Sequence, residues 1–335
     1  TTVAASTHDR NNQADVTLGN GAKYSGASLN VNALGSAPMI TSIAAKAATA
    51  SDSDANLCFL NSGGAPTLDP AKTAGKIVVC TRGTNARVEK SLTVANAGGV
   101  GMVLADNGAG LVAEAHSVPT VHVNAADGAA IKTYVGGAAP TASISAFYAG
   151  SKPAPIMAGF SSRGPNQGDA NILKPDLTAP GVDVIAGVTA DLTQAQRDAV
   201  AAGTLVPQAD FASYQGTSMS SPHVAGLAAL LRQAHPTWSP AAIKSALMTT
   251  TISTLTDGLT GISNGLLPWS QGTGHVVPNK ATDPGLVFDN SNIDWIRYQC
   301  KVNKAAVAPA SDCTTYGTLD ETYNVNLASI TVGAV

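Results

Sequence analysis

Charged and aromatic side chains are both scarce in this sequence. Asp, Glu, Lys and Arg make up 12% of its 335 residues, the formal net charge is −3, and aromatic residues make up 4%. A chain without a basic surplus has little to attract a phosphate backbone, and one with few aromatic rings offers no platform on which bases could stack. The composition therefore argues against nucleic acid as a partner.

Long apolar runs are missing as well. No stretch reaches the length of about 20 residues that a membrane-spanning helix needs, so no membrane partner is expected. Residues 1–6 lack the basic start and apolar centre of a signal peptide, and no methionine stands first. We therefore expect an N-terminus that was produced by processing or by cleavage.

The four cysteines include no Cys-x-x-Cys pair, and no histidine stands at metal-ligand spacing from them. They fall into two local pairs, Cys58 with Cys80 and Cys300 with Cys313. Two disulfides formed in an oxidising compartment are the favoured interpretation, which predicts an extracellular, secreted protein. Four buried free thiols are the alternative.

The length and the 44% apolar content are enough for about two domains. Within residues 23–149, β-branched runs bounded by glycine predict buried strands at 76–80, 101–105 and 120–123. A helix is predicted at 87–97, between the first two strands. Strand, helix and strand in this order predict an α/β unit with a parallel pair.

A second region follows a proline-rich break at 152–155. Strands are predicted at 157–160 and 182–186, and a long helix at 218–234, where apolar residues recur at helical spacing. Because this helix is apolar on most sides, it is expected in the centre of the protein. Another helix is predicted over 239–250, where a serine N-cap precedes a proline.

Ser218 stands at the start of the predicted long helix. A serine hydroxyl is a weak nucleophile, so it needs a base, a group that orients the base, and donors for the developing oxyanion. In the first turn of a helix its own N–H has no intrahelical partner, and the helix dipole favours negative charge. Pro222 is also expected in this first turn, where a missing N–H is tolerated. Taken alone, such a serine is more often only a helix cap.

The residues around Ser218 favour the nucleophile over the cap. The run GTSMSSPHVAG at 216–226 closely resembles the nucleophile motif of the subtilisin-like serine protease (subtilase) family. The resemblance implies that Ser218 is the nucleophile and that its backbone N–H is one oxyanion donor. His223 is a structural member of the same motif and is not expected to act as the base.

Other segments extend this resemblance over nearly the whole chain. The runs GFSSRGP at 159–165 and LKPDLTAPG at 173–181 resemble segments that precede the nucleophile in the family. The runs HPTWSP at 235–240 and GTGHVVP at 272–278 resemble segments that follow it.

Two further stretches resemble domains of the larger family members. Residues 58–134 resemble an inserted protease-associated (PA) domain, and YNVNLASI at 323–330 resembles the opening strand of a fibronectin III-like β domain. The implied fold is α/β: a partial subtilisin-like three-layer sandwich with a mostly parallel sheet, and a PA domain of mixed α/β structure. The expected division is a catalytic-domain strand segment at 1–22, a PA-like insert at 23–149, the C-terminal part of the catalytic domain at 150–290, and a linker with the first fibronectin III-like strand at 291–335.

The motifs that would complete the active site are not in this sequence. The family places its Asp, its His and its oxyanion-hole Asn before the segment that residues 1–6 resemble. None of the remaining histidines is therefore assigned as the base: His8, His116, His122, His235 and His275. We expect a secreted serine endopeptidase that acts on proteins or peptides, with the missing groups supplied by a separate, cleaved N-terminal chain of the same enzyme. The alternatives are an inactive fragment and a non-catalytic binding module of the PA type.

No cofactor is expected, and no metal site is assigned. Calcium sites are frequent in the family, but no run here has the spaced carboxylates of a calcium-binding loop. Asp176, Asp183 and Asp283 are expected at the surface or in turns, and Asp176 is expected to help hold its turn. The resemblance also implies that the insert shapes substrate access or self-association.

Overall fold

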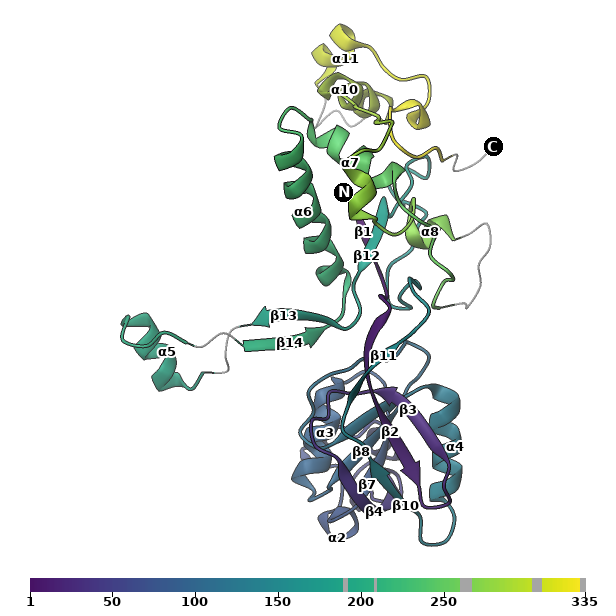
Figure 1. Ribbon diagram of the computed structural model, residues 1–335, viewed down its shortest axis with the longest axis vertical. Helices are drawn as coiled ribbons and strands as arrows, with labels where there is room; N and C mark the ends of the chain where they lie inside the picture. Colours follow the sequence, from purple (N-terminus) through teal and green to yellow (C-terminus); the bar gives the residue numbers. More distant parts are fainter. Residues whose placement is uncertain (189–191, 208–209, 260–266, 303–308, 332–335) are drawn as a thin grey trace. The chain divides into compact units, whose positions relative to one another are not determined.

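The computed structural model describes the chain except for residues 189–191, 208–209, 260–266, 303–308 and 332–335. It contains two compact units, each assembled from separate stretches of sequence (Figure 1). Unit 1 comprises Thr1–His8, Pro153–Val182 and Gly216–Val335, and unit 2 comprises Asp9–Lys152 and Asp183–Gln215. None of the described helices is long and apolar enough to cross a bilayer.

An eight-stranded sheet forms the centre of unit 2, in the order β10-β4-β7-β8-β9-β3-β2-β11. The neighbours from β4 to β9 run parallel, and the other pairs are antiparallel. Because β10 pairs with both β4 and β2, the sheet closes on itself. The strands are β2 (Arg10–Leu18), β3 (Lys23–Ala27), β4 (Leu34–Thr41), β7 (Ile77–Thr81), β8 (Gly101–Ala105), β9 (Thr120–Val123), β10 (Thr141–Ile144) and β11 (Tyr148–Ser151).

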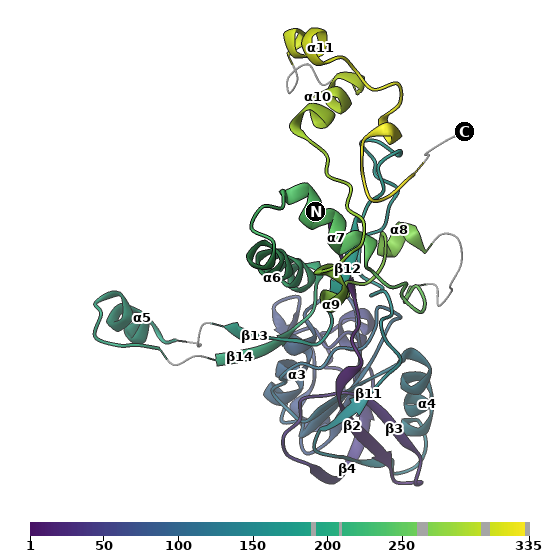
Figure 2. The same ribbon diagram turned by 45° about the horizontal axis from the view of Figure 1, so that its top comes forward.

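Two helices cover opposite faces of this sheet (Figure 2). α3 (Arg87–Asn96) lies over the face that carries Val78, and α4 (Ala125–Val135) over the face that carries Val79. Successive residues of a strand point to opposite faces, so β7 is buried on both sides, as its unbroken apolar run predicts. The predicted strand–helix–strand unit with its parallel pair is confirmed.

Smaller elements complete unit 2. β13 and β14 form an antiparallel hairpin, and the predicted strand at 182–186 corresponds to β13 but begins at Val184. The smaller elements are α1 (Asp52–Asn56), β5 (Asn61–Ser62), β6 (Ala65–Pro66), α2 (Pro70–Thr73), β13 (Val184–Val188), α5 (Gln194–Ala201) and β14 (Asp210–Tyr214).

Unit 2 begins earlier in the chain than the expected boundary at residues 22 and 23. β2 pairs with β3, β10 and β11, so the compact unit starts at Asp9. The polar-interrupted pattern of β2 suits a strand in either unit, and only its pairing partners decide which sheet it joins.

β1 (Val3–Ser6) and β12 (Leu177–Pro180) form a parallel pair in unit 1, and α6 (Thr217–Ala234) lies along both (Figure 1). The predicted helix at 218–234 is confirmed, with its start one residue earlier. The predicted helix at 239–250 is confirmed as α7 (Pro240–Thr249). Its N-cap, Ser239, accepts a hydrogen bond from the N–H of Ala242 at 3.0 Å.

The mostly parallel sheet expected for unit 1 is represented in its described part by the parallel pair β1 and β12. Two other expectations for unit 1 are corrected. Residues 157–160 form no strand, because Met157 makes only isolated bridges, to Ser6 and Asp257, before the chain turns. α6 is not surrounded by protein: Val224 and Leu231 are buried, but the side chain of Leu230 is 61% exposed.

Both expected cysteine pairs are disulfides. Cys58 is bonded to Cys80 in unit 2, and Cys300 to Cys313 in unit 1, where the bond joins α10 (Asn292–Lys301) to α11 (Ala310–Tyr316). The strand expected at 323–330 is absent: these residues contain the end of a 3-10 turn, η1 (Thr322–Asn324), and then extended loop. The remaining short helices of unit 1 are α8 (Pro268–Gln271) and α9 (Pro278–Ala281).

Candidate active site

Ser218 is the second residue of α6, and its side chain is exposed. Gly216 precedes the helix with a φ of 152°, a value that residues with a Cβ rarely adopt. Its N–H donates to the carbonyl of Gly181 at 2.8 Å. Among the described residues, neither the N–H nor the hydroxyl of Ser218 has a hydrogen-bond partner. An exposed hydroxyl therefore stands beside a free helical N–H.

The turn after β12 fixes the start of this helix. A Cβ on Gly181 would lie 2.2 Å from Ser220 Oγ and 2.7 Å from Ala5 Cβ, so a side chain does not fit there. Ser220 is fully buried, and its hydroxyl donates to the carbonyl of Ala179 at 3.0 Å. Close packing and hydrogen bonds together attach the first turn of α6 to β12.

The sequence predicts Pro222 in the first turn of the helix, and this prediction is wrong. α6 starts at Thr217, so Pro222 is its sixth residue. At that position an ordinary residue would donate its N–H to the carbonyl of Ser218, four residues earlier. Proline has no N–H, so the Ser218 carbonyl receives no helical hydrogen bond.

No histidine of the described chain forms a hydrogen bond with Ser218. His223 donates from Nδ1 to the carbonyl of Met219 at 2.7 Å, which is a contact within its own helix. His235 stacks on the ring of Trp238, with centroids 3.9 Å apart. His8 is half-buried after β1, and His116 and His122 lie in unit 2.

His275 is half-buried in unit 1, with its Nδ1 2.8 Å from Ser6 Oγ. Burial, together with the charges of His223 and His8 nearby, lowers the pKa of His275 to about 4. The imidazole is therefore neutral at physiological pH.

Asp176 is not the surface turn residue that the sequence suggested. Its side chain is 2% exposed, and its carboxylate binds Lys174 at 2.8 Å and Lys244 at 2.9 Å and accepts from the N–H of Thr2 at 2.6 Å. Burial alone would raise the pKa of Asp176, but the charges of Lys244 and Lys174 and the hydrogen bonds lower it below its ordinary value. The pair with Lys244 joins α7 to the segment before β12. Sequence reasoning missed it because Lys244 lies far along the chain.

Asp183 is also buried, 8% exposed, with a φ of 53°, and it accepts a hydrogen bond from the N–H of Ala113 at 3.0 Å. It ties the start of β13 to a loop of unit 2 and is not at the surface. Asp283 is exposed, as expected.

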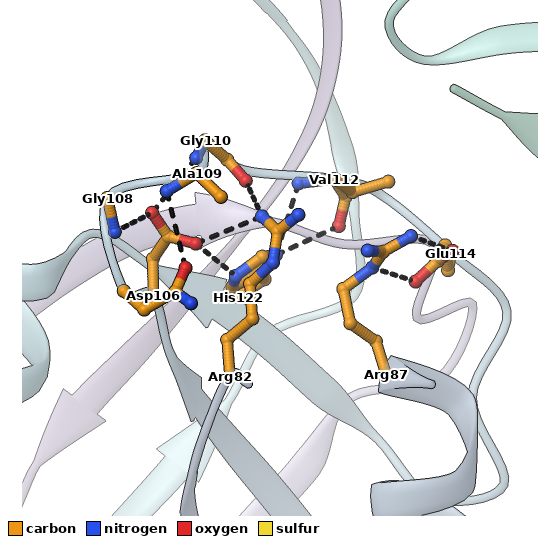
Figure 3. Close-up of polar contacts among 10 residues, drawn as sticks. Arg82, Arg87, Asp106, Gly108, Ala109, Gly110, Val112, Glu114 and His122 are labelled. Carbon is orange, nitrogen blue, oxygen red and sulfur yellow. Dashed lines mark hydrogen bonds and ion pairs between the residues drawn. The ribbon is translucent and has the colours of Figure 1, made fainter. Parts of the chain in front are cut away.

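A buried charged cluster lies at the carboxyl ends of the parallel strands of unit 2 (Figure 3). Asp106 Oδ1 is 3.0 Å from Arg82 Nη1 and 3.3 Å from His122 Nε2, and all three side chains are less than 10% exposed. Burial would raise the pKa of Asp106, but hydrogen bonds from His122 and Gly110 and the charge of Arg82 hold it far below its ordinary value. The second carboxylate oxygen accepts the N–H groups of Gly108 and Gly110.

This cluster holds a loop in place. Arg82 also donates to the carbonyl of Gly110, and a neighbouring pair, Arg87 with Glu114, closes the other end of the loop at 2.6 Å. Arg82 and Asp106 directly follow β7 and β8, and the carboxyl ends of parallel strands meet at one sheet edge. That spacing is the signal by which sequence reasoning could have found the cluster. Within the described part of the chain, no group of three or more His, Cys, Asp or Glu side chains is placed to hold a metal ion.

Comparison with known families shows which protein family contains the motif around Ser218. A sequence model described as "Subtilase family" matches residues 2–286, and this range includes β1, β12 and the whole of α6. The chain belongs to the subtilase family.

Plant proteases are among the relatives of this subtilase chain. It is 42% identical over 349 aligned residues to "Subtilisin-like protease SBT5.3" of Arabidopsis thaliana, an alignment that covers 99% of the chain and 44% of that protein. It is 45% identical over 316 residues to "Subtilisin-like protease SBT1.7" of the same plant, covering 90% of the chain and 40% of that protein. The chain thus spans less than half the length of these relatives. The role of Ser218 stays a prediction that rests on its motif and its place in the helix.

Proposed function

We propose that this subtilase chain is part of a secreted serine endopeptidase that hydrolyses peptide bonds through an acyl-enzyme on Ser218. The observation that carries the proposal is the exposed hydroxyl of Ser218 beside its own unpaired N–H at the start of α6. The relatives, whose names describe them as proteases, support the reaction class. The two disulfides support an oxidising, extracellular location.

In the proposed reaction, Ser218 Oγ attacks the carbonyl carbon of the scissile peptide while a base takes the hydroxyl proton. The carbonyl oxygen becomes an oxyanion, and the free N–H of Ser218 donates to it with the help of the helix dipole. The amine leaves with a proton from the base, and water then releases the acyl group by the same route in reverse.

The base, its orienting Asp and an oxyanion-hole Asn are proposed to come from an N-terminal part of the same enzyme, held as a separate cleaved chain. The uncovered face of α6 supports this. Ala225, Gly226 and Ala229 are exposed on the helix beside Leu230, and a Cβ added to Gly226 would meet no atom within 4 Å. An apolar helix face of this kind is normally covered by other parts of the protein.

A second candidate function is binding by unit 2, which we propose as a PA-type insert that recruits substrate or mediates self-association. The supporting observation is its closed sheet with its own buried core, which makes it a self-contained module. On the same grounds of resemblance, the residues after 290 are proposed to lead into a fibronectin III-like domain. Calcium binding by the enzyme is part of the proposal, and no site for it is assigned among the residues that the structure describes.

The experiment is activity-based labelling of the assembled protease, meaning this chain together with its N-terminal part. A fluorophosphonate probe should label the wild-type chain, and Ser218→Ala should abolish both labelling and peptide hydrolysis while the fold stays intact. Ser221→Ala is the matched control, because Ser221 is an exposed serine of the same helix, and it should label normally. Full activity of Ser218→Ala would refute the proposal, and an unlabelled wild-type chain that purifies as a single species would indicate an inactive fragment.

A further inference from the structure

A chain of hydrogen bonds runs from His275 to the turn that carries Ser218. His275 Nδ1 lies 2.8 Å from Ser6 Oγ, Ser6 Oγ lies 3.2 Å from the carbonyl oxygen of Ala179, and Ser220 Oγ lies 3.0 Å from the same oxygen. Ser6 and Ser220 are fully buried. The three contacts connect β1, β12 and the first turn of α6 within unit 1.

The protons in this series of hydrogen bonds can be placed by counting donors. The Ala179 carbonyl can only accept, so Ser220 and Ser6 must each donate their single hydroxyl proton to it. If Ser6 gave its proton to His275 instead, two oxygens 3.2 Å apart would face each other without a hydrogen between them. Ser6 Oγ therefore accepts, and His275 donates from Nδ1. A neutral imidazole carries one N–H, so this assignment fixes its tautomer.

The backbone around Ser218 explains why its turn needs support from outside the helix. The N–H of Ser218 has no partner within the described chain, and its carbonyl lacks a helical donor because residue 222 is proline. The N–H groups of Met219 and Ser220 share the carbonyl of Gly216, at 3.0 and 3.4 Å. The backbone N–H of Ser218 therefore adds no hydrogen bond within the described chain that would fix the nucleophile in position.

We propose that His275 is a positioning residue for the nucleophile, acting through Ser6, the Ala179 carbonyl and Ser220 on the first turn of α6. The inference rests on the proposed function of Ser218. The backbone of His275 is itself held in place. Its backbone N–H donates to the carbonyl of Ile252 at 2.7 Å, and its carbonyl accepts from the backbone N–H of Ile252 at 3.0 Å. By orienting the Ser6 hydroxyl, His275 keeps the acceptor of Ser220 in place, and Ser220 is two residues from Ser218.

The test compares His275→Asn with His275→Leu in the assembled protease. The Asn side-chain amide can donate to Ser6 from nearly the place of Nδ1, whereas Leu cannot donate. His275→Leu should lower kcat per fluorophosphonate-titrated site by about tenfold with KM unchanged, because small displacements of a reacting group slow the chemical step. His275→Asn should restore most of kcat. His235→Leu, a histidine at the other end of α6, should leave kcat per site unchanged.

A double-mutant cycle adds a readout that does not depend on the His275 variants alone. Ser220→Ala should lower kcat by a similar factor, and the double variant Ser220→Ala with His275→Leu should lose little more, because both changes break the same chain of contacts. Additive losses, or an unchanged kcat per site in His275→Leu, would overturn the inference while leaving Ser218 as the nucleophile. An active Ser218→Ala variant would instead overturn the proposed function, and this inference with it.

Discussion

Ser218 and Pro222 are one helical turn apart on α6, so the carbonyl of Ser218 faces a nitrogen that carries no hydrogen. Proline inside a helix removes one backbone hydrogen bond and crowds the preceding turn. The residue proposed as the nucleophile thus lies in a turn of α6 that lacks one regular helical hydrogen bond.

Replacing Pro222 by alanine should therefore stabilise this chain. The variant regains an N–H for the Ser218 carbonyl, and proline is up to about 3 kcal/mol less favourable than alanine inside a helix. We expect the free energy of unfolding, measured by urea titration, to rise by about 1 to 3 kcal/mol. Ser221→Ala, one residue away and also exposed, should change it by less. An unchanged urea midpoint in Pro222→Ala would show that the missing hydrogen bond does not matter.

Gly181→Ala should destabilise unit 1. The new Cβ would lie 2.2 Å from Ser220 Oγ and 2.8 Å from the carbonyl oxygen of Gly216, so β12 or α6 must shift. Overpacking of this kind typically costs about 1–3 kcal/mol. Gly226→Ala is the matched control: its Cβ meets no atom within 4 Å, and alanine should stabilise the helix by about 0.5–1 kcal/mol. The two variants should shift the melting temperature in opposite directions, and shifts in the same direction would contradict this account.

The sequence was informative wherever one local pattern decides the structure. Three predictions of this kind are confirmed, because each depends on residues that are neighbours in the sequence. They are the helix α6, the N-cap at Ser239 and the β7–α3–β8 unit. Asp176 is different, because its buried carboxylate is paired with Lys244 as well as with the neighbouring Lys174, and Lys244 is brought to it by the packing of α7.

Similar reasoning applies to β2, which lies within residues 1–22, the segment expected to belong to the catalytic domain. Its polar-interrupted pattern suits a strand in either unit. β3 follows it directly, but its other partners, β10 and β11, come more than 100 residues later in the chain. Pairing over such distances leaves no local signal. The motif around Ser218 could be recognised, whereas the hydrogen bond between His275 and Ser6 joins residues that are far apart in the sequence.

Acid should destabilise unit 2 through His116. Burial lowers the pKa of His116 to about 4, and its Nδ1 is 3.0 Å from Ser91 Oγ. Because its ordinary pKa is 6.5, the unfolded chain binds more protons than the folded chain between pH 4 and 6.5. The contribution of His116 to stability is therefore complete above pH 6.5 and is lost as the pH falls toward 4. His116→Gln should reduce the slope of unfolding free energy against pH in this window, and an identical slope would contradict the prediction.

Excision of Asp9–Lys152 should separate the two proposed roles of unit 2. The N–H of Lys152 donates to the carbonyl of Asp9 at 3.1 Å, so a short glycine-serine linker can join the cut ends. If the insert recruits substrate, the excised protease should keep its rate on a small peptide and lose rate on a protein substrate. Equal losses on both substrates would mean that the insert is structural.

A control is needed because excision also removes the hydrogen bond from Ala113 to Asp183. Asp183→Gly removes this acceptor while tolerating the left-handed φ of 53°, and it leaves the insert in place. If Asp183→Gly slows both substrates as much as the excision does, the contact with Ala113 accounts for the loss. A loss confined to protein substrates and absent from Asp183→Gly would assign recruitment to the surface of the insert itself.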